Sequence, residues 1–258
     1  MTYHAKTNGA KSSLLIGADI VETVHYVYQP VICASTKATL YFEQLARFED
    51  EHDQPRRTQT IIEWLEVTGD IIALDIHSFD VAIETLRAHS DINIGVNISG
   101  ATLSKKDACA EIIALLRNSP EVCPRLYVEV TETHAISNML YAAEFASALD
   151  GLGMQLVVDD FGEGNSTALY LSVLYPAVVK LRMTSGQGAT PEILEKAALA
   201  RTYGSALVVE GLETPEDLLR FPKSLVDFYQ GYHVGRPAEL HYWRMHKPRM
   251  DLRLVSNR

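Results

Sequence analysis

Carboxylates, an amide and a lysine close a series of short apolar runs along the chain. These closing residues are Glu43, Asn97, Glu129, the pair Asp159 and Asp160, Lys180 and Glu210. Apolar runs of this length are typical of strands buried on both faces, where an unpaired ionisable group is rare. We therefore expect these side chains to meet at one opening, where their oxygens would bind hard divalent cations such as Mg²⁺ or Mn²⁺.

The adjacent aspartates carry the strongest part of this prediction. Asp159 and Asp160 follow the apolar residues Leu156, Val157 and Val158, and two neighbouring carboxylates at a buried strand end repel each other unless cations neutralise them. Such a pair can hold two divalent ions about 3.5–4 Å apart, as phosphodiester cleavage requires. Taken alone, the motif is equally compatible with a turn that caps the next helix.

Lys180 and Glu210 add groups that could act on a substrate. Lys180 is compatible with a surface lysine whose stem lies along apolar residues, or with a group that holds a phosphate oxygen or an attacking water. Glu210 is placed to act as a general base. Any one of the other acidic residues could be a capping or salt-bridging residue, but their joint recurrence favours a shared metal site.

The spacing of these residues predicts the elements that position them. Glu129 follows Asn97 by 32 positions, Asp159 comes 30 later, Lys180 a further 21 and Glu210 a further 30. A (β/α)8 barrel of about 250 residues averages about 31 per unit, and its active site lies at the carboxyl ends of the strands. We predict strands at 25–32 and 38–45 before the remaining runs, and helices at 58–67, 71–88, 107–116, 137–149, 166–174 and 191–203.

Length and composition limit the alternatives. The 258 residues, 47% of them hydrophobic, predict a single barrel domain over residues 23–258 after an N-terminal lead-in of 1–22. A net charge of −10 argues against a nucleic-acid polymer or an anionic membrane as partner. The three cysteines lack any C-x-x-C spacing, and no apolar run is long enough to insert into a membrane, so we expect a cytoplasmic protein.

Seven short motifs occur between about residues 25 and 240. They are Tyr28-Gln29-Pro30-Val31, Glu43-Gln44-Leu45-Ala46-Arg47, Asn97-Ile98-Ser99, Glu129-Val130-Thr131-Glu132, Asp159 to Gly164, Glu210 to Thr214, and Gln230 to Pro237. In type and order they resemble the motifs of the EAL-domain phosphodiesterases, which hydrolyse the bacterial second messenger cyclic di-GMP.

The resemblance implies an α/β fold, a modified (β/α)8 TIM-type barrel with an antiparallel first strand. It also implies hydrolysis of cyclic di-GMP to linear 5′-pGpG with two divalent cations, Mg²⁺ or Mn²⁺, and a homodimer with a possible regulatory protein partner. The implied metal ligands are Glu43, Asn97, Glu129, Asp159 and Asp160. By the same resemblance Lys180 orients the water, Glu210 is the general base, Glu132 holds the loop after the double aspartate, and Gln29, Arg47 and Gln230 belong to the substrate side of the site.

Three departures from the family pattern bear on this prediction. Gln44 replaces the alanine of the naming motif, but its side chain should point away from that of Glu43. Arg182 replaces a carboxylate two residues after Lys180, which adds a cation that would weaken metal binding or depress the pKa of Lys180, or else bind a phosphate. Glu163 and Asn165 alter the loop that in the family links the metal site to the dimer interface. The alternative is a catalytically weak or inactive barrel of this type that acts as a cyclic di-GMP receptor or a protein-binding module. A phosphodiesterase for another phosphodiester is a third hypothesis.

Overall fold

The computed structural model describes residues 12–16, 20–50, 52–131, 133–164, 168–186, 188–246 and 248, with side chains from residue 23 onward. Its strands are β1 (Ser12–Ile16), β2 (Ile20–Cys33), β3 (Thr39–Glu49), β4 (Ile94–Ser99), β5 (Leu126–Thr131), β6 (Gln155–Val158), β7 (Val178–Arg182), β8 (Ala206–Glu210) and β9 (Phe228–Tyr229). Its α-helices are α1 (Thr58–Thr68), α2 (Ile71–Ala88), α3 (Gly100–Leu103), α4 (Lys106–Arg117), α5 (Met139–Gly151), α6 (Ala168–Leu174), α7 (Pro191–Thr202) and α8 (Leu240–Met245), with 3-10 turns at Cys123–Arg125, Asp217–Leu219 and Lys223–Leu225.

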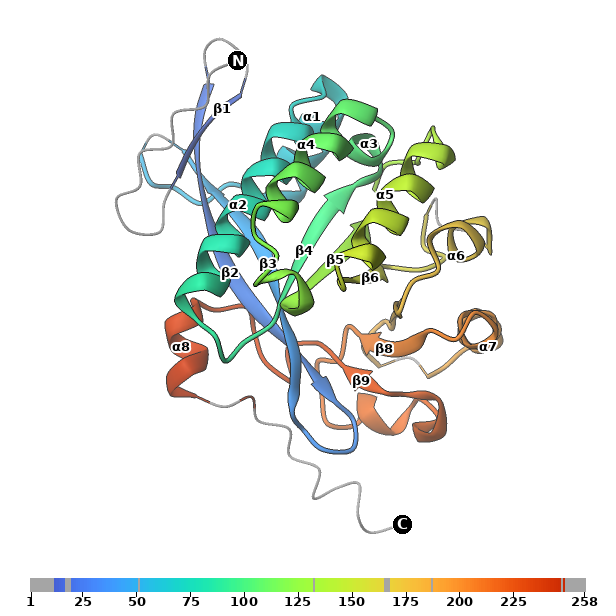
Figure 1. Ribbon diagram of the computed structural model, residues 1–258. Coiled ribbons are helices and arrows are strands. Elements are labelled where there is room, and N and C mark those ends of the chain that lie inside the picture. Colours follow the sequence, from blue (N-terminus) through green and yellow to red (C-terminus); the bar gives the residue numbers. More distant parts are fainter. Residues whose placement is uncertain are drawn as a thin grey trace.

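Strands β2 to β9 close into a barrel, as predicted. Each of the pairs from β3–β4 through β8–β9 is parallel, whereas β2 is antiparallel to both β3 and β9. The expected modified (β/α)8 barrel with an antiparallel first strand is therefore confirmed. Figure 1 shows the helices around the outside of the strands, where they cover the outer face that parallel strands must bury.

The barrel interior is filled in two layers of opposite character. Five buried apolar residues, Val31, Tyr41, Val157, Val178 and Val208, form one cluster. Successive side chains alternate across a strand, so a residue two positions along faces the same way. Glu43, Asp159, Lys180 and Glu210 each lie two positions after a member of this cluster. The barrel interior thus has a polar layer toward the carboxyl ends of the parallel strands and an apolar layer next to it.

Gln29 lies in the same polar layer, although its strand runs in the opposite direction to β3. It precedes Val31 by two residues on β2 and pairs in register with Glu43 on β3. Because β2 is antiparallel, its earlier residues, rather than its later ones, lie at the mouth. Pro30 lies within this strand, next to a register shift at Val31 and Ile32, a type of position at which a strand tolerates proline.

The outer face of β3 carries the substituted residue of the naming motif. Gln44 is buried and donates a hydrogen bond of 2.9 Å to the carbonyl of Ser78 on α2. The hydroxyl of Tyr28 donates to the Gln44 side-chain oxygen over 3.4 Å. The prediction that Gln44 points away from Glu43 is confirmed, and Gln44 belongs to the contact between sheet and helices.

The predicted helices correspond to α1, α2, α4, α5, α6 and α7. Helix α2 has the predicted bounds, and α1, α4, α5 and α7 differ from theirs by one or two residues at one or both ends. The predicted first two residues of α6, 166 and 167, lie outside the described residues. Helix α1 ends at Gly69, whose φ of 84° is the left-handed conformation that glycine adopts without steric cost. Within the predicted lead-in of residues 1–22, β1 forms an antiparallel pair with the start of β2. None of the helices in the described ranges has the length and apolar character needed to cross a lipid bilayer.

Candidate metal centre at the barrel mouth

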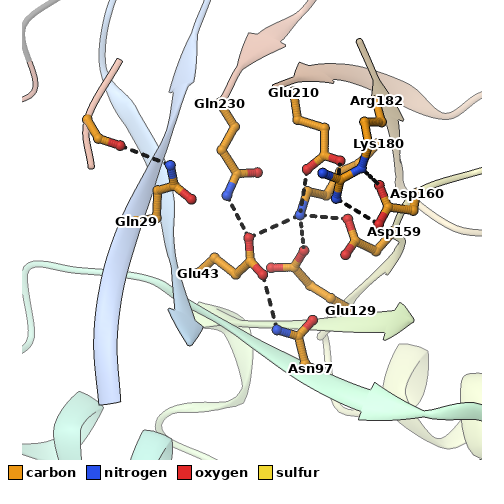
Figure 2. A network of polar contacts seen from close by, with 11 residues as sticks. Gln29, Glu43, Asn97, Glu129, Asp159, Asp160, Lys180, Arg182, Glu210 and Gln230 are labelled. Carbon is orange, nitrogen blue, oxygen red and sulfur yellow. Dashed lines mark hydrogen bonds and ion pairs between the residues drawn. The ribbon is translucent and has the colours of Figure 1, made fainter. Parts of the chain in front are cut away.

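Lys180 lies at the centre of the polar layer, with its side chain only 1% exposed. Its Nζ atom is 3.1 Å from Glu43 Oε2, 3.0 Å from Glu129 Oε2, 2.7 Å from Asp159 Oδ1 and 3.6 Å from Glu210 Oε2. Figure 2 shows these carboxylates converging on the ammonium from separate strands. The interpretation of Lys180 as a surface lysine is therefore wrong, since the end of β7 faces the barrel interior.

Amide side chains support the carboxylate of Glu43 from both sides. Asn97 Nδ2 donates to Glu43 Oε1 over 3.1 Å, and Gln230 Nε2 donates to Glu43 Oε2 over 2.6 Å. Asn97 comes from β4 and Gln230 directly follows β9, so residues far apart in the chain fix one carboxylate. This orientation leaves the side-chain oxygens of Asn97 and Gln230 free for another partner.

Asp160 and Glu210 form a second group at the rim of the polar layer, joined by Arg182. Arg182 Nε and Nη2 lie 2.5 and 2.8 Å from the two Asp160 oxygens, and Nη2 is also 3.1 Å from Glu210 Oε1. Asp160 itself has a φ of 50°, in the left-handed region that aspartate tolerates better than most residues. This turn directs Asp160 to the rim while Asp159 points to Lys180.

Burial and neighbouring charges shift the protonation of these groups in opposite directions. Burial opposes a charged ammonium at Lys180, but the surrounding carboxylates outweigh it and raise the pKa of Lys180 well above its usual value. Burial raises the pKa of Glu129 to about 8, despite the attraction of Lys180. Burial likewise raises the pKa of Glu210 well above its usual range, although Lys180 opposes the shift. A carboxylate with a raised pKa is a stronger proton acceptor, as a general base must be.

Two groups of carboxylates have the geometry of a divalent-cation site. Glu43, Glu129 and Asp159 form one group, and Asp159, Asp160 and Glu210 form the other; within each group, one ligand atom per residue lies within 4.8 Å of the others. Asp159 is shared, so one carboxylate joins the two groups. All their donors are oxygens, which suits hard cations.

Unsatisfied buried atoms support the fit of a cation to the first group. Among the described side chains of this site, the buried oxygens without a hydrogen-bond partner are Asn97 Oδ1, Glu129 Oε1, Asp159 Oδ1, Glu210 Oε1 and Gln230 Oε1. A buried oxygen without a partner costs free energy unless a donor or a cation satisfies it. The oxygen-rich first group therefore fits a divalent ion, which Glu43, Asn97, Glu129 and Asp159 would hold.

A cavity of about 330 Å³ opens over this centre. It is lined by Glu43, Asp159, Lys180, Arg182, Glu210 and Gln230, and also by the predicted substrate-side residues Gln29 and Arg47. Gln29 Nε2 donates to the carbonyl of Gly235 over 2.9 Å, and Arg47 Nη1 to the neighbouring Ala46 carbonyl over 2.8 Å. Every predicted site residue that the structure describes thus lines the cavity or contacts a residue that does.

Tyr232 lines the same cavity, and we had assigned it no role from the sequence. Its ring is 48% exposed, and the guanidinium carbon of Arg236 lies 4.3 Å from its centre. The available signal was its position in the motif from Gln230 to Pro237, two residues after a predicted site residue. An exposed aromatic face at the mouth of a cavity is suited to stacking on a planar ring.

Part of the loop after the double aspartate is also defined. Lys196 on α7 donates a 2.9 Å hydrogen bond to the Gly162 carbonyl and lies 3.4 Å from a Glu163 carboxylate oxygen. This contact ties the loop that follows Asp160 to a helix on the barrel exterior. Two of the predicted loop residues, Glu132 and Asn165, lie outside the described residues.

Comparison with known proteins agrees with this site. The EAL domain family model matches residues 20–237. The probable cyclic di-GMP phosphodiesterase PdeN of Escherichia coli K12 is 25% identical over 230 residues, which are 85% of this chain and 44% of PdeN. The bifunctional diguanylate cyclase/cyclic di-GMP phosphodiesterase MucR of Pseudomonas aeruginosa is 28% identical over 222 residues, 81% of this chain and 32% of MucR. The chain thus spans less than half the length of either relative.

A solved structure shows the same fold. The EAL domain protein from Listeria monocytogenes EGD-e superimposes with a TM-score of 0.75 at 20% identity, covering 86% of this chain and 91% of that one. Because the family model covers most of the chain and the strand order is that of a closed barrel, the chain belongs to the EAL domain family.

Proposed function

We propose that this protein is a divalent-cation-dependent phosphodiesterase that hydrolyses cyclic di-GMP to linear 5′-pGpG. The observation that carries the proposal is the pair of carboxylate groups sharing Asp159, beneath a cavity also lined by Lys180 and Glu210. PdeN and MucR, whose names assign them cyclic di-GMP phosphodiesterase activity, support the choice of substrate.

Two cations, Mg²⁺ or Mn²⁺, would be held by Glu43, Asn97, Glu129, Asp159 and Asp160. When bound, they would supply positive charge to the phosphodiester and to the attacking water. Glu210 would accept a proton from that water, and Lys180 would orient it. As the water oxygen bonds to phosphorus, the bond to the 3′ oxygen breaks and that oxygen takes up a proton.

The remaining cavity residues would bind the substrate. Arg47 would contact a phosphate through charge-assisted hydrogen bonds, with Gln29 beside it. Gln230 would keep Glu43 in position through the 2.6 Å hydrogen bond. Glu132 would hold the loop after the double aspartate. A homodimer, a regulatory partner and a location in the cytoplasm stay predictions for this chain.

One observation favours a second candidate function. Arg182 pairs with both Asp160 and Glu210, so the group proposed as general base is held by a cation of the chain itself. A receptor that binds cyclic di-GMP without cleaving it would be compatible with this pairing.

The deciding experiment is incubation of the purified protein with cyclic di-GMP in Mg²⁺, Mn²⁺ and Ca²⁺ separately, with chromatographic detection of pGpG. We expect product with Mg²⁺ or Mn²⁺, and a loss of kcat of about 10²–10⁴-fold in Glu210→Gln with nucleotide binding retained. Nucleotide binding without product in the wild type would favour the receptor. Unchanged turnover in Glu210→Gln would contradict the role of Glu210.

A further inference from the structure

Arg182 contacts Asp160 in the second carboxylate group through two nitrogens, whereas Lys180 contacts the first group through one nitrogen only. Its guanidinium forms a two-pronged contact with both oxygens of Asp160 and reaches Glu210 Oε1 through Nη2. Figure 2 shows the Arg182 side chain beside both Asp160 and Glu210. A planar guanidinium matches carboxylate geometry in this bidentate mode, which makes such contacts strong and directional.

Lys180 occupies the oxygens of the first group less completely than Arg182 occupies those of Asp160. The ammonium of Lys180 is a single point of charge shared among four carboxylates, and Glu129 Oε1 and Asn97 Oδ1 have no hydrogen-bond partner among the described residues. In the second group, by contrast, Arg182 contacts both Asp160 oxygens and one Glu210 oxygen. Both Asp160 oxygens, which a second cation would need, already accept hydrogen bonds from Arg182, whereas Glu210 Oε1 lies 3.1 Å from Nη2 without a hydrogen bond.

We propose that Arg182 competes with the second divalent cation, so that the two cation positions of this chain have unequal affinity. The proposal rests on the function proposed above. One ion binds tightly through Glu43, Asn97, Glu129 and Asp159. A second ion binds beside Asp160 and Glu210 only when Arg182 moves away, and its side chain, 52% exposed, has solvent into which it can turn.

The first test counts bound Mn²⁺ on the metal-free full chain by electron paramagnetic resonance of the free ion. In the wild type we expect one tight site and a second site weaker by about tenfold or more, the order of magnitude of a charge-assisted contact. In Arg182→Gln we expect the second site to tighten by about tenfold while the first stays unchanged. Arg182→Asp should tighten the second site further, since it adds a carboxylate.

Control variants locate the effect. Arg87→Gln removes one positive charge from an exposed pair with Glu121, away from the centre, and should leave both sites as in the wild type. Asp160→Asn should remove the weak site and retain the tight one. Circular dichroism and thermal unfolding of each variant establish that it is folded, and Arg182→Gln provides the reading if Arg182→Asp does not fold.

Two equal sites in the wild type, or an unchanged weak site in Arg182→Gln, would overturn the proposal. If the wild type also cleaves cyclic di-GMP in that case, the proposed function stands without it. Conversely, a second site that tightens in Arg182→Gln with no cleavage by any variant would support the competition and contradict the phosphodiesterase. An absence of Mn²⁺ binding in every variant would overturn both.

Discussion

Lys180 Nζ lies 3.0 Å from Glu129 Oε2 in a part of the barrel where the two side chains are 1% and 0% exposed. The residues come from β7 and β5, with β6 and its aspartates between them. A charge in such an environment is stable only when partners replace its hydration. The pair is therefore the electrostatic centre of the site. Removing either partner would leave buried charge less well compensated.

Replacing Lys180 by methionine should destabilise the cation-free protein by roughly 3–5 kcal/mol, because it leaves several buried carboxylates without a counter-charge. Mn²⁺ should restore more stability to this variant than to the wild type, since it supplies the missing charge. Urea unfolding in chelator and in Mn²⁺ measures both quantities. Lys106→Met, at an exposed position on α4, is the control and should change stability by less than about 1 kcal/mol; an equal loss there would contradict the argument.

Replacing Gly95 by alanine should weaken cation binding. A Cβ atom at this position of β4 would collide with Glu129 Oε1 and lie 2.6 Å from the Tyr41 ring, so the glutamate must move out of its position. We expect a loss of Mn²⁺ affinity of about tenfold or more, measured by titration. Gly151→Ala is the matched control, because a Cβ there meets nothing within 4 Å. Wild-type affinity in Gly95→Ala would show that Glu129 is not a ligand.

Replacing Gln44 by alanine introduces the residue typical of the family but should lower stability. The change leaves a cavity against α2 and removes the partner of the buried Tyr28 hydroxyl, so we expect a loss of about 2 kcal/mol in urea unfolding. Gln59→Ala, on the exposed face of α1, should stay within about 0.5 kcal/mol. Because Gln44 faces away from the cavity, kcat/KM should not change; a loss of activity would place this residue in the site.

Stability should depend on pH through Asp75. Burial raises the pKa of Asp75 from 3.8 to about 7, even though Thr102 and the Ser99 amide donate hydrogen bonds to it. The folded state then keeps a proton that the unfolded state releases, so this contribution is complete below about pH 4 and is lost as the pH rises through about 7. The loss amounts to about 4 kcal/mol.

Asp75→Asn provides the test of this pH dependence, because an amide cannot ionise. Urea unfolding at pH 5 and at pH 8 should show a smaller decrease in stability for the variant than for the wild type. The same decrease in both proteins would mean that Asp75 does not change its protonation in the folded state between pH 5 and pH 8.

Tyr232→Ala should raise the KM for cyclic di-GMP by about tenfold, the effect expected when one base loses its stacking partner. Tyr232→Phe keeps the aromatic face and should behave like the wild type. Steady-state kinetics on the three proteins separate a change in KM from a change in kcat. An equal effect of both substitutions would assign the role to the hydroxyl instead of the ring.

The polar residues of the site and the apolar residues before them could be predicted from the sequence alone, but not every strand end, since Glu43 lies inside β3, which continues to Glu49. Glu43, Asn97, Glu129, Asp159 and Lys180 each follow apolar residues, and from Asn97 onward they recur every 21 to 32 residues, close to the length of a βα unit. The parallel order of the strands then brings these residues to one mouth of the barrel, which is why the metal-site prediction could be made from the sequence. The seven motifs narrowed the prediction to one family.

The tertiary structure decided how these groups pair with one another. Lys180 could be interpreted from the chain alone as a surface residue, and only the closed barrel places its ammonium among four carboxylates. Arg182 was recognised as an added cation, but its contact with both Asp160 and Glu210 depends on the left-handed turn at Asp160 and on β7 and β8 being neighbours. Such contacts join residues far apart along the chain, and their distances follow from strand register and closure, which local patterns of residue type do not encode.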